Sequence, residues 1–115
     1  MGKLSTHVLD TALGKPASGV LVSLERVGAD GRSGSEVSRH VTDADGRVRE
    51  LLPTGEAVEA GTYKLTFETG AYFKLRNVEA FYPSVMVTFE VRDPKQHHHV
   101  PLLLSPFGYS TYRGS

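Results

Sequence analysis

The amino-acid sequence predicts an all-β protein, an antiparallel β-sandwich with one short helix. Three stretches of the chain alternate between apolar and polar side chains, which is the pattern of strands with one buried face. Turn-forming residues separate these stretches at the intervals typical of a sandwich and leave room for about seven or eight strands. One segment lacks the alternation and is predicted to be helical.

The first strand is expected over residues 4–10. Alternation divides its side chains between two faces, with Leu4, Thr6, Val8 and Asp10 on one and Ser5, His7 and Leu9 on the other. A histidine in the middle of a strand is either an ordinary half-exposed residue or part of a site. A turn is expected next, at Gly14-Lys15-Pro16.

The three clearest strands supply the predicted core. Their apolar sets are Val20, Val22 and Leu24 in the first, Tyr63, Leu65 and Phe67 in the second, and Val85, Val87, Phe89 and Val91 in the third. Further turns are expected over residues 28–35, 45–46, 59–62 and 92–95. The stretch 28–35 is polar and rich in glycine, so it is predicted to be a loop.

The segment 69–77 is the predicted helix, because Tyr72, Phe73 and Leu75 do not alternate as strand residues do. Thr69 is expected to cap the N-terminus of this helix. Asn77 is expected to adopt the left-handed conformation that follows many helices.

The sequence of the last fourteen residues is not typical of a disordered terminus. An apolar run, Leu102 to Leu104, leads into a Ser-Pro-Phe-Gly turn, and Tyr109, Thr111 and Arg113 alternate after it. Terminal residues are usually disordered unless something holds them. We therefore expect this segment to be ordered, with the Ser115 carboxylate as a fixed charge beside Arg113.

Length and composition limit the class of protein. The 115 residues are predicted to form a single domain, residues 1–115. Thirteen basic and thirteen acidic residues balance, which argues against nucleic acid or an anionic membrane as a partner. There is no cysteine and so no disulfide framework. Without a membrane-length apolar run or a secretory signal in the sequence, the expected location is the cytoplasm.

Histidine and arginine are the candidates for chemistry. His7 lies in the first strand, and Arg47 follows a tight turn, Asp45-Gly46, that starts another strand. In the run His97-His98-His99, alternation places the first and third histidines on one face and His98 on the other.

Two kinds of chemistry fit these residues. A His-x-His pair on a strand, with His7 as a third ligand, could bind a metal ion. Metal-free acid/base catalysis is the other interpretation, because a neutral imidazole can accept a proton near pH 7. Arg47 or Arg113 would then hold an anionic or carbonyl-rich substrate with the planar guanidinium group.

Several motifs together resemble the transthyretin-related family of 5-hydroxyisourate hydrolases. They are Leu-Ser-Thr-His-Val-Leu-Asp at 4–10, Gly-Lys-Pro-Ala at 14–17, Thr-Asp-Ala-Asp-Gly-Arg at 42–47, His-Val-Pro-Leu-Leu-Leu-Ser-Pro at 99–106 and Tyr-Arg-Gly-Ser at 112–115. The resemblance covers essentially the whole chain. It implies the transthyretin-like sandwich of two four-stranded sheets with one short helix.

The resemblance also implies a reaction and the residues that perform it. The reaction is hydrolysis of 5-hydroxyisourate to 2-oxo-4-hydroxy-4-carboxy-5-ureidoimidazoline in urate degradation, without metal or organic cofactor. His7, Arg47 and His99 would be the catalytic residues, with Tyr112, Arg113, Gly114 and Ser115 completing the substrate pocket. His98 stands where the family commonly has tyrosine, and His40 has no implied role. The implied assembly is a homotetramer, a dimer of dimers around a channel.

Two alternatives belong to other functional classes. The same fold could serve as a non-catalytic module that binds or transports a small molecule, although such a carrier has no need of two imidazoles and two guanidinium groups around one pocket. A small adhesion domain is the second alternative, and it predicts neither turnover nor an ordered C-terminal segment.

Overall fold

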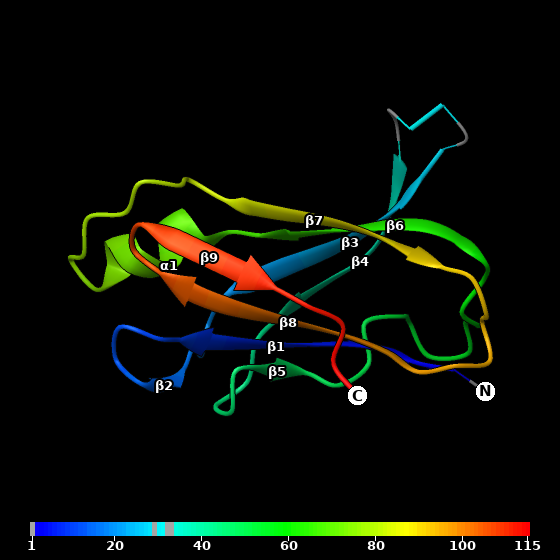
Figure 1. Ribbon diagram of the computed structural model, residues 1–115, viewed down its shortest axis with the longest axis horizontal. Helices are drawn as coiled ribbons and strands as arrows, with labels where there is room; N and C mark the ends of the chain where they lie inside the picture. The colour runs from blue at the N-terminus through cyan, green and yellow to red at the C-terminus, as the bar shows by residue number, and fades with distance from the viewer. Residues whose placement is uncertain (1, 29, 32–33) are drawn as a thin grey trace.

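The computed structural model describes residues 2–28, 30–31 and 34–115, and it consists of two stacked β-sheets with a helix at one end (Figure 1). One sheet has the strand order β2-β1-β8-β9. Its strands are β1 (Leu4–Asp10), β2 (Lys15–Pro16), β8 (His98–Ser105) and β9 (Gly108–Thr111). The short β5 (Arg47–Val48) also pairs with β1 and makes this the larger sheet.

The second sheet has the order β4-β3-β6-β7. It contains β3 (Leu21–Val27), β4 (Gly34–Val41), β6 (Gly61–Phe67) and β7 (Val85–Val91). The helix α1 (Thr69–Leu75) lies in the connection from β6 to β7. The expected pair of four-stranded sheets with one short helix is thus confirmed in the described residues, with β5 as an addition to the first sheet.

One strand pair departs from the antiparallel prediction. The strands β1 and β8 run parallel, with Ser5 opposite His99 and His7 opposite Pro101. Adjacent hairpin strands must be antiparallel, but strands so far apart in the chain are free of that constraint. This pairing joins the two segments that carry the candidate histidines.

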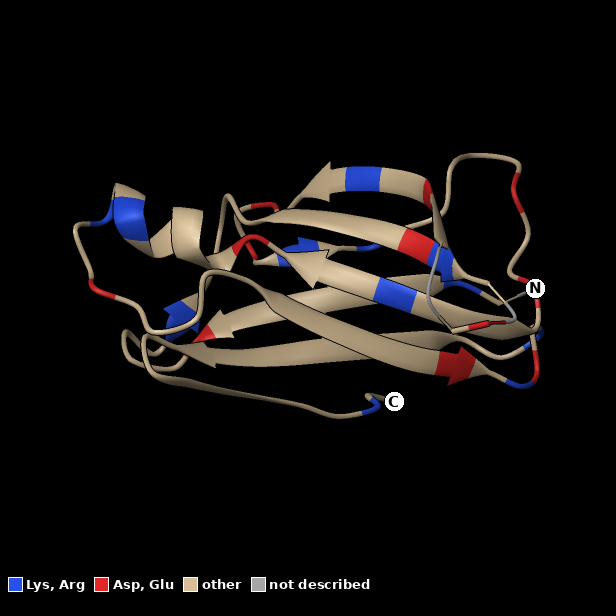
Figure 2. Ribbon diagram, turned by 90° about the horizontal axis from the view of Figure 1, so that it is seen from above, with Lys and Arg blue, Asp and Glu red and all other residues tan. Residues whose placement is uncertain are grey.

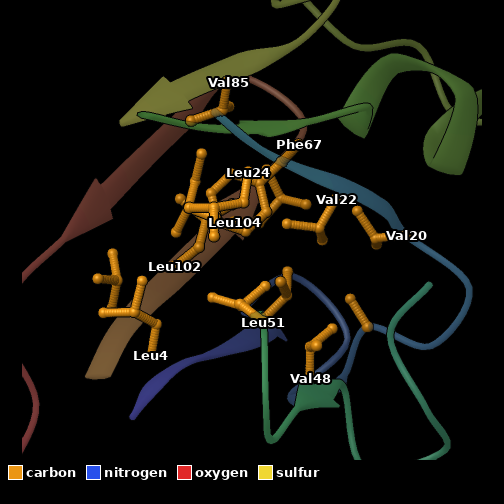
Figure 3. Packing of buried hydrophobic residues seen from close by; sticks show 14 of the residues in the cluster. Leu4, Val20, Val22, Leu24, Val48, Leu51, Phe67, Val85, Leu102 and Leu104 are labelled. Carbon is orange, nitrogen blue, oxygen red and sulfur yellow. The ribbon is translucent and has the colours of Figure 1, made fainter. Parts of the chain in front are cut away.

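The core lies between the sheets, where the predicted alternation is confirmed (Figure 3). Val20, Val22 and Leu24 are completely buried, as are Leu65 and Phe67. Leu102 and Leu104 cover them from the opposite sheet (Figure 3). Each such side chain contributes about 1.5–3 kcal/mol by leaving water, so this layer fixes how the two sheets stack.

The helix α1 forms where it is predicted, but its N-terminus differs. Glu68 occupies the capping position and makes no side-chain capping bond, whereas Thr69 is the first helical residue. The Thr69 side chain faces the interior, where its hydroxyl has no hydrogen-bond partner, so the expected Thr69 cap is wrong. Asn77 has the expected left-handed conformation, with φ of 57°.

A buried polar contact fastens the helix to the first sheet. The Tyr72 hydroxyl donates to Asp10 Oδ2 at 2.8 Å, and the other carboxylate oxygen accepts the backbone N–H groups of Ala12 and Leu13. The Arg76 guanidinium lies 3.8 Å above the Tyr72 ring. Burial and the bond to Asp10 raise the pKa of Tyr72 to about 12, so the hydroxyl remains a donor at neutral pH.

The predicted loop at 28–35 lies partly outside the described residues, and within it β4 already begins at Gly34. Figure 2 shows basic and acidic positions interspersed along the strands and turns, in keeping with the balanced charge. No helix in the described ranges is long and apolar enough to cross a membrane.

Candidate active site

The candidate site lies on the outer face of the first sheet, where β1 and β8 are neighbours. The inward side chains of β1 are buried, and Ser5 and His7 project from the opposite face as predicted. The parallel register sets Ser5 beside His99 and His7 beside Pro101. This face therefore brings together His7 and His99, the two histidines that the family resemblance implies to be catalytic.

Arg47 reaches the same face through a tight turn. The Asp43 carboxylate accepts the backbone N–H groups of Asp45 and Arg47, and Gly46 has φ of 74°. A Cβ at Gly46 would lie 2.4 Å from the Val8 carbonyl oxygen, so the close approach of turn and strand requires glycine. Arg47 then pairs directly with His7 across β1 and β5.

The three consecutive histidines have different surroundings. Ser5 Oγ lies 2.9 Å from His97 Nε2 and 2.7 Å from His99 Nδ1, so these two imidazoles share one hydroxyl. His98 is buried on the opposite face, with its Nδ1 3.0 Å from the Gln96 carbonyl oxygen. The predicted division of this run between two faces is confirmed.

Both candidate catalytic imidazoles hold a proton less readily than a free histidine does. Burial lowers the pKa of His99, and the Arg47 charge and the neighbouring imidazoles of His7 and His97 lower it further. Burial, followed by the Arg47 charge, also lowers the pKa of His7, although the Asp45 backbone and carboxylate oppose this effect. Both groups are consequently uncharged at neutral pH, as a general base must be.

The segment after β9 folds back onto the candidate site (Figure 1). The Gly114 backbone N–H donates to the His99 carbonyl oxygen at 2.8 Å. A Cβ at Gly114 would lie 2.6 Å from His99 Cδ2, so glycine is required for this approach. Within the chain, the segment 112–115 thus contacts a candidate catalytic residue directly.

Members of this segment face different cavities. Ser115 lines the same pocket as Arg47 and His99. Tyr112 and Arg113 instead line a groove between β7 and β8, and the Arg113 guanidinium donates to Gln96 Oε1 at 3.1 Å. His99 borders both cavities.

The pocket beside Arg47 and His99 is open and polar, with a volume of about 680 Å³, which is ample for a small heterocycle. Its lining residues are Lys3, Ser5, Thr6, Arg47, Arg49, Glu50, His97, His99 and Ser115. His7 does not line it and adjoins it through Arg47 and His99. Lys3 forms an ion pair with Glu50 at 3.1 Å, and Arg49 with Asp45 at 3.4 Å.

Ser5, Lys3 and Arg49 are site residues that the sequence patterns did not reveal. Ser5 was placed on the correct face, but a serine in a strand carries no signal until its neighbour across the sheet is known. His40 lies half-buried on β4, with Nε2 3.0 Å from the Leu51 carbonyl oxygen. Among the described residues, no group of three or more His, Cys, Asp or Glu side chains is arranged to hold a metal ion.

Comparison with known proteins agrees with this architecture. The model of the HIUase/Transthyretin family matches residues 4–114. A Rhizobium meliloti protein named 5-hydroxyisourate hydrolase 2 is 49% identical over 119 residues, which cover 99% of this chain and 97% of that protein. The solved structure of Klebsiella pneumoniae 5-hydroxyisourate hydrolase has a TM-score of 0.86 at 40% identity, covering 100% of this chain and 94% of the other. Sea bream transthyretin in complex with thyroxine has a TM-score of 0.88 at 31% identity, covering 97% and 94% respectively.

Proposed function

The chain belongs to the HIUase/transthyretin family, and from this membership we propose that it hydrolyses 5-hydroxyisourate to 2-oxo-4-hydroxy-4-carboxy-5-ureidoimidazoline in urate degradation. The observation that carries the proposal is the cluster of uncharged imidazoles and a guanidinium group on one sheet face. The chain is 49% and 40% identical, over nearly its full length, to two proteins named for this activity, and this similarity supports the proposal.

The reaction needs three things from the protein. A base must remove a proton from water as its oxygen attacks a ring acyl carbon, a donor must stabilise the resulting oxyanion, and the ring nitrogen must receive a proton as the C–N bond breaks. His7 and His99 are suited to the proton transfers because they are uncharged at neutral pH. Arg47 is suited to the oxyanion and to orienting the planar substrate, since its fork is permanently charged. No metal or organic cofactor enters this scheme.

The polar lining of the pocket favours hydrolysis over the transport alternative. Sea bream transthyretin, which has been solved with thyroxine, has a similar fold, so fold alone does not separate the two functions. Charged and polar side chains form the pocket wall, among them Arg47, Lys3 with its partner Glu50, and the imidazoles of His97 and His99. Such a wall suits a small, oxygen-rich heterocycle far better than a large apolar ligand.

The direct test generates 5-hydroxyisourate from urate with urate oxidase and follows the loss of its near-ultraviolet absorbance. The purified protein should accelerate this loss above the spontaneous rate. Decay that stays at the spontaneous rate over the whole range of protein concentration would refute the hydrolase proposal and leave the transport module.

Single substitutions test the proposed catalytic residues. Changing His7, Arg47 or His99 to Ala should lower kcat/KM by about 10² or more, as is typical when a general base or an oxyanion donor is lost. Arg39→Ala is the control, because Arg39 is exposed on β4 and pairs with Glu36 there. Circular dichroism would verify that each variant is folded. Near-normal activity of any of the three Ala variants would show that the residue changed in it is not catalytic.

We further propose that the functional unit is a homotetramer, a dimer of dimers. The strands β7 and β9 end their sheets, and such edges are usually covered or blunted. Near them Met86, Phe81 and Tyr109 are exposed, which supports burial against other subunits. Light scattering should give about four times the 12.5 kDa chain mass, and a monomer mass at working concentrations would contradict this assembly.

A further inference from the structure

The Ser5 hydroxyl joins two imidazoles that differ in their exposure. Ser5 is buried in β1, and its Oγ lies within hydrogen-bond distance of His97 Nε2 and His99 Nδ1. His97 is exposed to solvent, whereas His99 is half-buried beside Arg47. The hydroxyl therefore stands between the candidate base and a histidine that is in contact with water.

Because a hydroxyl group has a single proton, the tautomer of one ring determines the tautomer of the other. Ser5 has one proton to donate and lone pairs to accept, so it can donate to only one of the two nitrogens. The other ring must then donate its own N–H to Ser5 Oγ. If both rings donated, the buried hydroxyl proton would lose both of these acceptors, at a cost of about 1–3 kcal/mol.

Only one of the two coupled arrangements makes His99 a base toward the pocket. Its Nδ1 is occupied by Ser5, so proton transfer in the pocket falls to Nε2. The Nε2 nitrogen is unprotonated, and so can accept a proton, when Nδ1 carries the ring proton and donates a hydrogen bond to Ser5 Oγ. Ser5 then donates its own proton to His97 Nε2.

We propose that Ser5 and His97 are positioning residues that set the tautomer of His99 and move the charge of the proton it accepts to the exposed His97, an inference that rests on the proposed hydrolase function. When His99 Nε2 takes a proton from the attacking water, the Nδ1 proton passes to Ser5 Oγ. The original Ser5 proton passes to His97 Nε2. His99 is then neutral with its proton on Nε2, and the positive charge resides on the exposed His97. When the Nε2 proton moves to the departing ring nitrogen, His97 Nε2 returns a proton to Ser5 Oγ and Ser5 returns its own to His99 Nδ1, which restores the starting arrangement.

The surrounding charges favour this direction of transfer. His99 faces Arg47 from β5 and His7 from β1, and both groups oppose a positive charge on its ring. A charged imidazole is better solvated at the exposed His97 than at the half-buried His99. Arg113 Nη2 donates a hydrogen bond to the backbone carbonyl oxygen of His97 at 3.4 Å. This contact does not involve the ring nitrogens of His97.

Steady-state kinetics of four variants test the proposal. Ser5→Ala and His97→Ala should each lower kcat by about tenfold or more with KM changed less, because the orientation of His99 and the transfer of its charge are lost whereas Arg47 is unchanged. Ser5→Thr keeps a hydroxyl and should retain most of kcat. Lys95→Ala, an exposed change in the same turn, should match wild type. Imidazole added to His97→Ala should restore part of kcat and leave wild type unaffected.

A second readout does not depend on turnover. In ¹⁵N spectra of wild type, the imidazole shifts should report His99 protonated on Nδ1, and Ser5→Ala should abolish this preference. An unchanged His99 tautomer in Ser5→Ala, or kcat within about twofold of wild type in both Ala variants, would overturn the relay. A wild-type protein without turnover would instead refute the hydrolase function, and the spectra would still decide whether Ser5 sets the tautomer.

Discussion

At the scale of single residues, the candidate site depends on keeping imidazoles uncharged while surrounding them with positive charge. His7 and His99 are half-buried and lie near Arg47, and burial is the main cause of their lowered pKa values. A base of lowered pKa is a weaker proton acceptor, but it is available over a wider range of pH. The site thus favours availability of the base over its strength.

The pH dependence of kcat/KM should reflect this environment. The acid limb of the profile should have its midpoint below the ordinary histidine value of 6.5, because burial and the Arg47 charge lower the pKa of His99 in the free protein. Arg47→Gln should move the acid limb upward, toward 6.5, since it removes the largest charge that opposes protonation. An acid limb above 6.5 in the wild-type protein would contradict the assignment.

At the scale of elements, the segment after β9 and the helix α1 show what the sequence could and could not predict. Alternation predicted the faces of β1 and β8 because the period of two is a local property of a strand. It could not predict the register that sets Ser5 beside His99, which depends on strands far apart in the chain. The order of the segment 112–115 was expected, but the division of Ser115 and Arg113 between two cavities depends on side-chain packing.

Gly114 offers a test of the C-terminal segment that keeps the rest of the chain intact. Gly114→Ala should lower kcat/KM by about tenfold or more, because its Cβ would lie 2.6 Å from His99 Cδ2 and force the ring or the segment to move. Gly108→Ala is the matched control, since there the nearest atom, Ser105 Oγ, is 3.7 Å from the added Cβ. Kinetics and thermal denaturation of both proteins would be compared. Equal activity of the two variants would show that the close approach of Gly114 does not matter for turnover.

The contact between α1 and the first sheet should matter for stability. Tyr72→Phe removes the donor to the buried Asp10 carboxylate and should reduce the free energy of unfolding by about 1–3 kcal/mol. Tyr82→Phe, at a more exposed position beside Tyr109, is the control and should have little effect. Urea denaturation followed by circular dichroism measures both changes, and a loss as large for Tyr82→Phe would show that the Asp10 contact is not the cause.

At the scale of the whole molecule, the two sheets form a rigid support for a polar face. The core that holds them together was predicted from periodicity alone, because burial of alternate residues needs no knowledge of the partner strand. The chemistry lies on the other side of one of these sheets, where Arg47 arrives through β5, a strand of two residues that leaves almost no periodic signal. Its position followed from the turn before it and from the family resemblance.

The parallel pairing of β1 with β8 has a consequence for how the protein folds. Ser5 and His99 are separated by 94 positions in the chain, yet they are hydrogen-bonded neighbours. Contacts between such distant residues form slowly, because the loop between them must close before any bond compensates the lost entropy. Hairpins such as β8–β9 can form early, whereas the active face must wait for the first and the eighth strands to meet. Recovery of hydrolysis after dilution from denaturant should consequently report the last step of folding rather than the first.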